Sequence, residues 1–413
     1  MPPFCIAEWL PTDQAAFAAW MDQLGVDAAA VAALDPVLRD FGACVENDPA
    51  LFALAHQMFD DVPRHAPYDC DPTGHPQLHN FGQLLRKIQV VLSTPPWFNQ
   101  TGLAGLPINA MVAWSMATSA GHAFFLHPQV NFHFKRILNA WGAFLQTSAS
   151  LPALGEHPRT GWFGEDAMRE MPHFDEEFVC DPALPYRGFS SWDNFFTRRF
   201  RDGQRPVEAP DDNAVIVNPC ESAPYKLMEG VQLHERFWIK AQPYSLKHML
   251  ADDAMAAQFA GGTVYQAFLS AFSYHRWHSP VAGTIVATRV IDGSYYAETQ
   301  PEGFDDCGPR RSMAYITQLA TRALIYLQAD HPGIGLLCFM AVGMAEVSTC
   351  EVGVQAGQRV AKGEQLGMFH FGGSSCCLLF RPQTRLAFDL HGQVPGLEAG
   401  NIDLNSRIAT VLS

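Results

Sequence analysis

Three short segments of the chain hold residues suited to nucleophilic and acid–base chemistry. They are GMFHFGGSSCCLLF (367–380), YHRWHSPVAG (274–283) and VIVNPCESAPY (215–225). In the first, Ser374 follows two glycines, and residues without a Cβ let the backbone bring a hydroxyl close to a carbonyl. A serine becomes a nucleophile when a histidine such as His275 or His278 removes its proton, and a carboxylate such as Glu221 can hold that histidine in the useful tautomer. Together the segments offer a nucleophile, a base and an acid.

Each segment also has a plainer interpretation. The glycines are typical of a tight turn between strands, the histidines of ordinary hydrogen-bonded core residues, and Glu221 of a surface loop. On a helix, His275 and His278 would share a face and suit a metal, but Pro280 favours a strand end and a turn. The chain has no GxSxG, P-loop, GxGxxG, HExxH, EF-hand or CxxC motif. A serine hydrolase is therefore only one of several interpretations.

The first third of the chain is predicted to be helical. Apolar residues recur at helical spacing within 17–24, 78–92 and 134–145. Thr12 or Asp13 is expected to cap the first of these helices, and Gly25 to end it. The stretch 106–126 is long enough for a membrane span, but its polar residues favour a helix buried inside a globular domain.

From about Val215 onward, short apolar runs separated by Gly and Pro predict strands. Helical patches are expected at 245–259 and at 312–327, although the second patch suits a strand equally well. The sequence therefore predicts an α+β protein, with a helical N-terminal domain over 1–155 and a mostly β domain over 156–413.

The net charge narrows the range of partners. Lys plus Arg number 27 and Asp plus Glu number 42, so the formal charge is 27 − 42 = −15. Nucleic-acid binding and electrostatic attachment to anionic membranes both need clustered basic residues, and both are disfavoured. No basic segment followed by an apolar run marks a secretory signal, and the ten cysteines are scattered. We expect a cytoplasmic protein with reduced thiols, no metal site and no membrane span.

The second half of the chain closely resembles the phosphatidylserine decarboxylase family, whose members cut themselves and form a pyruvoyl cofactor. The segments that carry this resemblance are SWDNFFTRRFRDGQRPV (191–207), VNPCES (217–222), KAQPYSLKHML (240–250), YHRWHSPVAGTI (274–285) and VQAGQRVAKGEQLGMFHFGGSS (354–375). The stretch 118–154 resembles the extra domain of a soluble branch of the family, which includes fungal tryptophan decarboxylase.

The resemblance implies a role for each candidate residue. Ser374 would attack the carbonyl of Gly373, and the chain would be cut between them to leave a pyruvoyl group derived from Ser374. His278 would be the base for this step, and His275 would serve in decarboxylation. The products would be a β chain, 1–373, and an α chain of 413 − 373 = 40 residues. The two chains would remain associated, and a homo-oligomer is left open.

Two positions depart from the family pattern. Glu221 stands where the family has Asp, so the acid partner of His278 could come from elsewhere in the chain. Ser375 stands where Thr is usual, so the cleavage register could slip by one residue. We favour Ser374 because Gly373 best tolerates the strained attack geometry. Lys362 lies in a turn similar to lipoyl-type hairpins and is expected to be architectural.

The family resemblance implies loss of an amino-acid α-carboxylate as CO2. A free amino acid is favoured, with an aromatic one such as L-tryptophan, which would give tryptamine, as the leading case. Phosphatidylserine is the alternative, but the sequence shows neither an apolar anchor nor a basic amphipathic face. Outside this class, a non-processing serine hydrolase and a scaffold protein remain as hypotheses.

Overall fold

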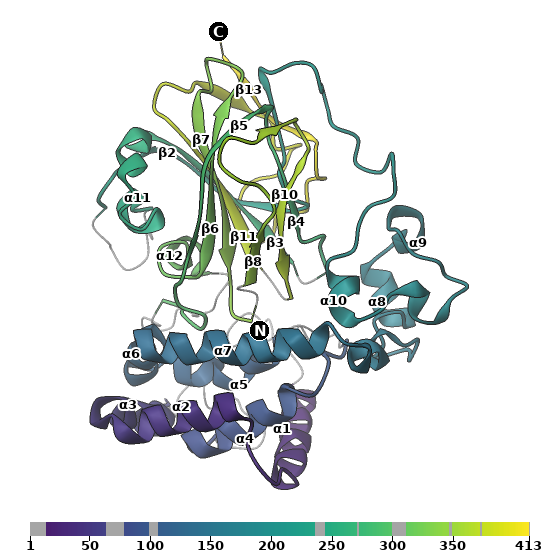
Figure 1. The fold of residues 1–413 in the computed structure, drawn as a ribbon, viewed down its shortest axis with the longest axis vertical. Coiled ribbons are helices and arrows are strands. Elements are labelled where there is room, and N and C mark those ends of the chain that lie inside the picture. The colour runs from purple at the N-terminus through teal and green to yellow at the C-terminus, as the bar shows by residue number, and fades with distance from the viewer. Residues whose placement is uncertain are drawn as a thin grey trace, which may run out of the picture. The chain divides into compact units, whose positions relative to one another are not determined.

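The computed structural model describes residues 14–62, 78–98, 106–235, 244–270, 272–299, 311–346, 349–371 and 374–412. Their contacts divide the chain into two compact units. The first unit comprises Met1–Phe174, Cys180–Phe195 and Ser294–Ser312. The second comprises Asp175–Val179, Phe196–Gly293 and Met313–Ser413. The first unit is built from helices and the second mainly from strands, which confirms the predicted α+β class (Figure 1).

The helices up to residue 196 come in chain order. They are α1 (Gln14–Ala29), α2 (Pro36–Asn47), α3 (Pro49–Asp60), α4 (Phe81–Val91), α5 (Pro107–Met116), α6 (Ser119–Leu126), α7 (Pro128–Leu145), η3 (Ser148–Leu154), α8 (Glu165–Glu170), α9 (Phe174–Glu177), η4 (Pro185–Gly188) and α10 (Trp192–Phe196). Proline opens α2, α3, α5 and α7, where its missing N–H has no intrahelical partner to lose.

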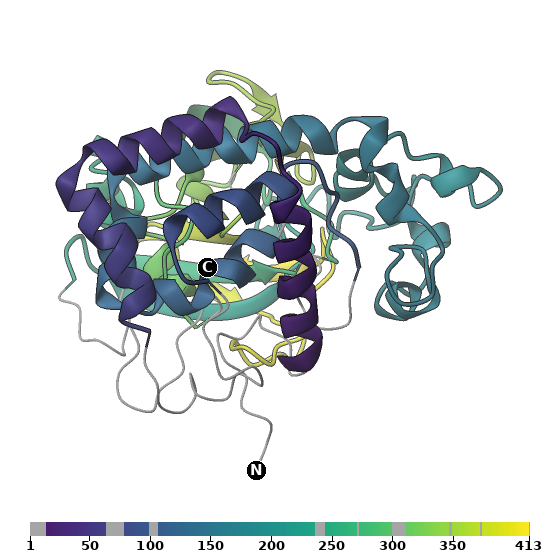
Figure 2. The same ribbon diagram turned by 90° about the horizontal axis from the view of Figure 1, so that it is seen from below.

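Aromatic residues form the core of the first unit. The ring of Phe41 on α2 lies 5.1 Å from Phe81 on α4, 6.2 Å from Phe124 on α6 and 5.3 Å from Phe134 on α7. All four side chains are buried, and each such burial contributes about 1.5–3 kcal/mol. In Figures 1 and 2, α2 and α7 lie side by side.

Two of the expected helices differ from their prediction. Helix α1 continues through Gly25 to Ala29, so the predicted stop at Gly25 is wrong. A Cβ built there would lie 3.7 Å from Lys87 Nζ, an ordinary van der Waals distance, so the helix does not require glycine at this position. The expected cap at Thr12 or Asp13 lies outside the described residues.

The stretch 106–126 forms two buried helices rather than one. Ala117 ends the first, and Thr118 caps the second, because its hydroxyl accepts from the N–H of Gly121. A Cβ on Gly121 would lie 1.8 Å from the Ser115 carbonyl oxygen, so only glycine allows the close turn between α5 and α6.

A segment from the second half of the sequence belongs to the first unit. The N–H of Tyr295 donates to Asn131 Oδ1 on α7 at 3.1 Å. The ring of Tyr296 lies 4.7 Å from Phe134 and 6.1 Å from Phe125. Sequence order alone therefore does not define the unit. The predicted division into domains 1–155 and 156–413 stays a prediction.

The second unit contains three antiparallel sheets and a few short helices. The strands are β1 (Val215–Val217), β2 (Ala223–Val231), β3 (Gly262–Leu269), β4 (Arg276–His278), β5 (Gly283–Ile291), β6 (Arg322–Ala329), β7 (Leu336–Gly343), β8 (Thr349–Val352), β9 (Arg359–Val360), β10 (Gln365–His370), β11 (Ser374–Phe380), β12 (Leu386–Phe388) and β13 (Arg407–Val411). The helices are α11 (Leu246–Met249), η5 (Ala254–Phe259) and α12 (Met313–Ile316).

The largest sheet has the strand order β2-β3-β11-β7-β6-β5-β9, and the other two are β4-β10-β8 and β1-β13-β12. Trp277 on β4 joins two of these sheets, because its ring lies 5.8 Å from Phe339 on β7. The stretch 312–327, predicted as helix or strand, contains both: α12 is one turn long, and β6 follows.

Candidate active site

Ser374 begins β11, a central strand of the seven-stranded sheet. It pairs with Leu269 on β3 and with Gly343 on β7. The residue is fully buried, and its hydroxyl makes no hydrogen bond to any residue that the structure describes. A buried hydroxyl without a partner is costly in a folded protein, and a catalytic role is one of the explanations for such a group. Gly373, the other half of the predicted cleavage site, lies outside the described residues.

Ser375 is as buried as Ser374, but its side chain lies on the other face of the sheet and its hydroxyl is hydrogen-bonded. Side chains alternate along a strand, so Ser374 and Ser375 lie on opposite faces of the sheet. The hydroxyl of Ser375 accepts from Gln266 Nε2 at 3.1 Å, and the Oε1 of Gln266 accepts from the Tyr244 hydroxyl at 2.6 Å. All of these side chains are fully buried.

His278, at the end of β4, is held through both ring nitrogens. Its Nδ1 lies 2.8 Å from the Gly363 carbonyl oxygen, and its Nε2 lies 3.0 Å from the Tyr274 hydroxyl. A carbonyl can only accept, which assigns the proton to Nδ1 and leaves Nε2 to accept from Tyr274. Burial, aided by the charge of Arg276, lowers the pKa of His278 to about 4. The imidazole is therefore neutral at pH 7 and can accept a proton.

His275 is fully buried beside the segment that leads to Ser374. Its ring stacks on Phe196 at 4.0 Å, and Phe196 lies 6.0 Å from Phe371. The carbonyl of His275 also accepts from the N–H of Phe369 on β10 at 3.0 Å. Phe371 has a φ of 53°, a left-handed conformation that is uncommon for a bulky residue. The chain is thus turned sharply just before the two glycines.

Glu221 binds an arginine. Its Oε1 lies 2.8 Å from Arg205 Nη2, and its Oε2 accepts from the N–H of Leu404 at 2.7 Å. Arg205 also reaches Glu177, at 3.3 Å. Burial raises the pKa of Glu221 above its ordinary value, and the hydrogen bonds from Arg205 and Leu404 partly offset that rise. Within the described part of the chain, no hydrogen bond joins Glu221 to His278.

The Glu221 turn nevertheless faces the same side of the sheet as Ser374. The thiol of Cys220 lies near that of Cys376, which helps to raise the pKa of Cys220, and the Cys376 side chain lies on the Ser374 face of β11. The N–H of His278 donates to the Pro219 carbonyl at 2.9 Å. The three segments singled out in the sequence therefore meet in one region of the second unit.

Aromatic rings link the acid to the histidine. The guanidinium of Arg205 lies 4.6 Å from the centre of the Phe200 ring, and that ring lies 4.5 Å from Tyr274. Sequence reasoning missed three residues that contact the candidate residues, namely Arg205, Tyr274 and Gln266. Arg205 and Tyr274 stand in the segments that carried the family resemblance, but their spacing gave no sign of what they bind.

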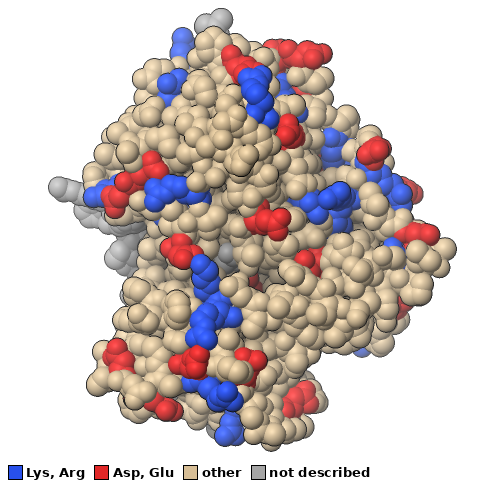
Figure 3. Space-filling model, viewed as in Figure 1, with Lys and Arg blue, Asp and Glu red and all other residues tan. Residues whose placement is uncertain are grey.

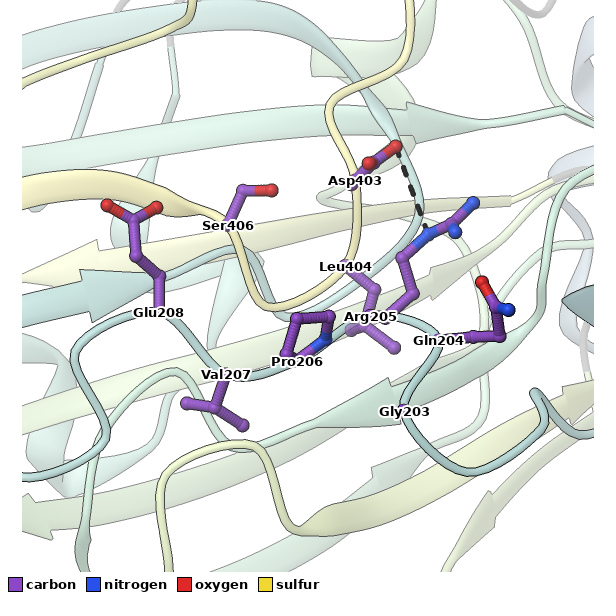
Figure 4. A pocket seen from close by; sticks show the side chains of 9 residues that line it. All are labelled: Gly203, Gln204, Arg205, Pro206, Val207, Glu208, Asp403, Leu404 and Ser406. Atoms are coloured by element: carbon purple, nitrogen blue, oxygen red, sulfur yellow. Dashed lines mark ion pairs between the residues drawn. The ribbon is translucent and has the colours of Figure 1, made fainter.

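A pocket of about 410 Å³ adjoins Arg205 (Figure 4). It is lined by residues 203–208 and by Asp403, Leu404 and Ser406. In Figure 4 the arginine side chain points toward Asp403, and the two charged groups approach to 3.9 Å. Neither Ser374 nor the two histidines line this pocket, so we do not assign it to substrate.

Lys362 lies in the turn between β9 and β10 and is largely buried. Its Nζ donates to the carbonyls of Ala209 at 2.8 Å and Asp212 at 2.7 Å. These bonds tie the β9–β10 turn to the loop that precedes β1, which is the architectural role expected.

Family models match most of the chain. Two models described as phosphatidylserine decarboxylase match residues 35–171 and 192–401. The chain belongs to the phosphatidylserine decarboxylase family. As a member of this family it is a decarboxylase, that is, a carboxy-lyase.

Relatives place this decarboxylase near a fungal branch of the family. It is 48% identical to decarboxylase iboD of Amanita muscaria over 302 residues, which is 69% of this chain and 86% of the relative. It is 36% identical to L-tryptophan decarboxylase of Psilocybe cyanescens over 404 residues, 91% of this chain and 88% of the relative. It is 29% identical to a phosphatidylserine decarboxylase proenzyme of Chlamydia trachomatis over 259 residues, 61% of this chain and 80% of the relative.

Two further observations bear on partners of the decarboxylase. None of the described helices is both long enough and apolar enough to cross a membrane. On the face shown in Figure 3, Lys and Arg are interspersed with Asp and Glu over a largely uncharged surface.

Proposed function

We propose that the protein cuts itself between Gly373 and Ser374 and then decarboxylates a free aromatic amino acid, with L-tryptophan converted to tryptamine as the leading case. The observation that carries this proposal is the fully buried Ser374 hydroxyl, which has no hydrogen-bond partner among the described residues while Ser375 has one. The word proenzyme in the name of the Chlamydia relative supports self-processing in this family.

The cut follows from the chemistry of the serine. The Ser374 oxygen attacks the Gly373 carbonyl, and the peptide nitrogen leaves, so that the amide becomes an ester. Loss of the Ser374 α-proton then breaks the bond between Cβ and Oγ, and the β chain departs with a complete Gly373 carboxylate. Water finally replaces the nitrogen of the residue left at position 374, which releases ammonia and leaves a pyruvoyl group. In total one water is consumed and one ammonia is released.

Residues of the second unit serve these steps. His278 is neutral and is the proposed base. Its Nδ1 already carries a proton, so it takes the Ser374 proton at Nε2 by way of the Tyr274 hydroxyl, which donates to that nitrogen. Glu221 stabilises the turn on the Ser374 face through its ion pair with Arg205, and its role as a direct partner of His278 stays a prediction.

The surroundings of Ser374 fit a pyruvoyl group. Gly343, directly across the strand pair, has no side chain to fill the space beside residue 374. When present, the group withdraws electrons from the substrate as CO2 leaves. His275, buried against Phe196, returns a proton to the α-carbon of the product.

The new α chain is expected to stay bound to the β chain. Strand β11 pairs along its whole length with β3 on one side and with β7 on the other, so the cut leaves its pairing from Ser375 to Phe380 intact. The α chain can therefore be released only by breaking the centre of the sheet.

The substrate proposal rests on likeness to the fungal L-tryptophan decarboxylase along nearly the whole chain. The charge of −15 and the interspersed charges of Figure 3 offer little attraction to an anionic lipid surface. A cytoplasmic location stays a prediction.

The first experiment is the intact mass of the purified protein under denaturing conditions. We expect two chains, 1–373 and 374–413, with the smaller one lighter by the mass of one ammonia. The variant Ser374→Ala is expected to give one uncut chain without decarboxylase activity. An uncut wild-type chain, or a normally cut and active Ser374→Ala protein, would contradict the mechanism.

The second experiment compares CO2 release from L-tryptophan and from phosphatidylserine vesicles. We expect release from the free amino acid. Release only from the vesicles would overturn the substrate proposal and leave the self-processing untouched. An uncut chain labelled by serine-reactive probes would favour a hydrolase, and an uncut chain without labelling would favour a scaffold.

A further inference from the structure

Strand β11 has a sequence that specifies its register weakly. It begins Ser-Ser-Cys-Cys-Leu-Leu, so like residues come in pairs, and every residue of the strand is buried. Register is normally set by one buried and one solvated face, a contrast that this strand lacks. Over residues 374–379, therefore, hydrophobic patterning does little to decide which serine faces the histidines.

One particular slip is almost silent on the catalytic face. Moving the strand by one residue so that Ser375 takes the place of Ser374 replaces serine by serine. On the same face it replaces Cys376 by Cys377 and Leu378 by Leu379, and the residue type changes only at the far end of the strand, where Arg381 would replace Phe380. The chemistry would then cut after residue 374 instead of residue 373.

The opposite face does not tolerate that slip. There, Cys376 would replace Ser375 as the neighbour of Gln266. The Gln266 amide cannot turn over to adapt, because the Met313 carbonyl can only accept and lies 3.2 Å from Nε2. The Tyr244 hydroxyl holds the other end, Oε1, at 2.6 Å. All of these groups are buried, so an amide hydrogen left without the serine hydroxyl would be unpaired.

We propose that Gln266 is a positioning residue that selects the self-cleavage register, because its hydrogen bond to Ser375 holds Ser374 on the face of the histidines. The inference rests on the proposed self-processing. It assigns Gln266 no contact with substrate or with the reacting atoms. Tyr244 acts through it by fixing the orientation of the amide.

The test is the intact mass of the small chain from Gln266→Leu, a variant that removes the amide and nearly keeps its volume. We expect a second small chain of 413 − 374 = 39 residues, starting at Ser375 and also lighter by one ammonia than the unmodified segment. Loss of one hydrogen bond shifts a two-register equilibrium by about tenfold, which makes the second species readily visible beside the first.

Two controls separate register from general loss of structure. Gln318→Leu removes another largely buried glutamine of the same unit, whose Nε2 lies 3.5 Å from the Ala314 carbonyl, and should give a single small chain. Adding Ser375→Ala to Gln266→Leu removes the second nucleophile, so the 39-residue species should vanish. If Gln266 has a purely structural role, the Gln266→Leu protein will be less stable than the wild type, but its α chain will still start at residue 374.

The outcomes are distinguishable. A Gln266→Leu protein with a single 40-residue small chain, formed at the wild-type rate, overturns the inference and leaves the proposed function standing. If Gln266→Leu does not fold, Tyr244→Phe carries the test, with the same second species expected in smaller amount and a single species overturning the inference. An uncut wild-type protein removes the proposed function and the inference with it.

Discussion

The carboxylate of Glu221 and the guanidinium of Arg205 form a largely buried ion pair, with Oε1 2.8 Å from Nη2. The pair lies next to Cys220, whose thiol contacts the nucleophile strand, and it is linked through Phe200 to the Tyr274–His278 pair. Glu221 is thus connected to His278 through Arg205 and the rings of Phe200 and Tyr274. Four predictions follow from this network and its neighbours.

Replacing Arg205 by Met should destabilise the protein and slow self-processing. Removing one member of a buried pair leaves the other charge uncompensated, which costs about 3 kcal/mol in the free energy of unfolding. Urea unfolding and the rate of appearance of the small chain measure the two effects. Arg407→Met is the matched control, because Arg407 pairs with Glu208 at an exposed site, where such pairs contribute about 0–1 kcal/mol. Equal losses in the two variants would contradict the importance of the buried pair.

The free energy of unfolding should fall as the pH is lowered from about 6.5 to about 4, because His278 titrates differently in the folded and unfolded protein. The unfolded histidine takes up its proton near the ordinary histidine pKa of 6.5, but the folded one does so only near a pKa of about 4. Between these values the unfolded state binds more protons, so the free energy of unfolding falls as the pH falls, by about 3 kcal/mol in all. His278→Gln should lack this contribution. The difference between wild type and variant, measured by denaturant unfolding from pH 7 to 4, isolates it from other groups that titrate there.

Tyr274→Phe should slow self-processing by about tenfold, because the variant removes the only donor that the structure shows for Nε2 of His278 among the described residues. The measurement is the rate of small-chain formation in freshly purified precursor. Tyr326→Phe is the control: Tyr326 is also buried, and its hydroxyl makes no hydrogen bond within the described part of the chain. A wild-type rate in Tyr274→Phe would show that the tyrosine does not orient the histidine.

Lys362→Met should lower the midpoint of thermal unfolding. In the wild-type protein, the peptide that contains Lys362 should have the mass expected for an unmodified lysine. The variant leaves the carbonyls of Ala209 and Asp212 without their ammonium donor. Lys247→Met serves as the control, since Lys247 is partly exposed and pairs with Asp252 across 3.3 Å on the surface. A wild-type peptide carrying added mass on Lys362 would refute the architectural role.

Local patterns in the sequence were enough to predict much of the fold. Helical spacing of apolar residues located α4 and α7, and short apolar runs between Gly and Pro located the strands, because both signals depend on neighbouring residues. The prediction at Gly25 failed because a glycine inside a helix is tolerated at a cost of about 1 kcal/mol, and α1 continues to Ala29. The motifs of Ser374, His275, His278 and Glu221 were visible for the same local reason.

The sequence by itself determined which residue types are available for the chemistry and in which kind of element each lies. The tertiary structure alone decided that Glu221 binds Arg205, that Leu404, 183 residues further along the chain, completes its shell, and that Ser294–Ser312 joins the helical unit. It also gave two adjacent serines different surroundings. Ser374 and Ser375 are alike in the sequence, and they differ only because a sheet has two faces and Gln266 occupies one of them.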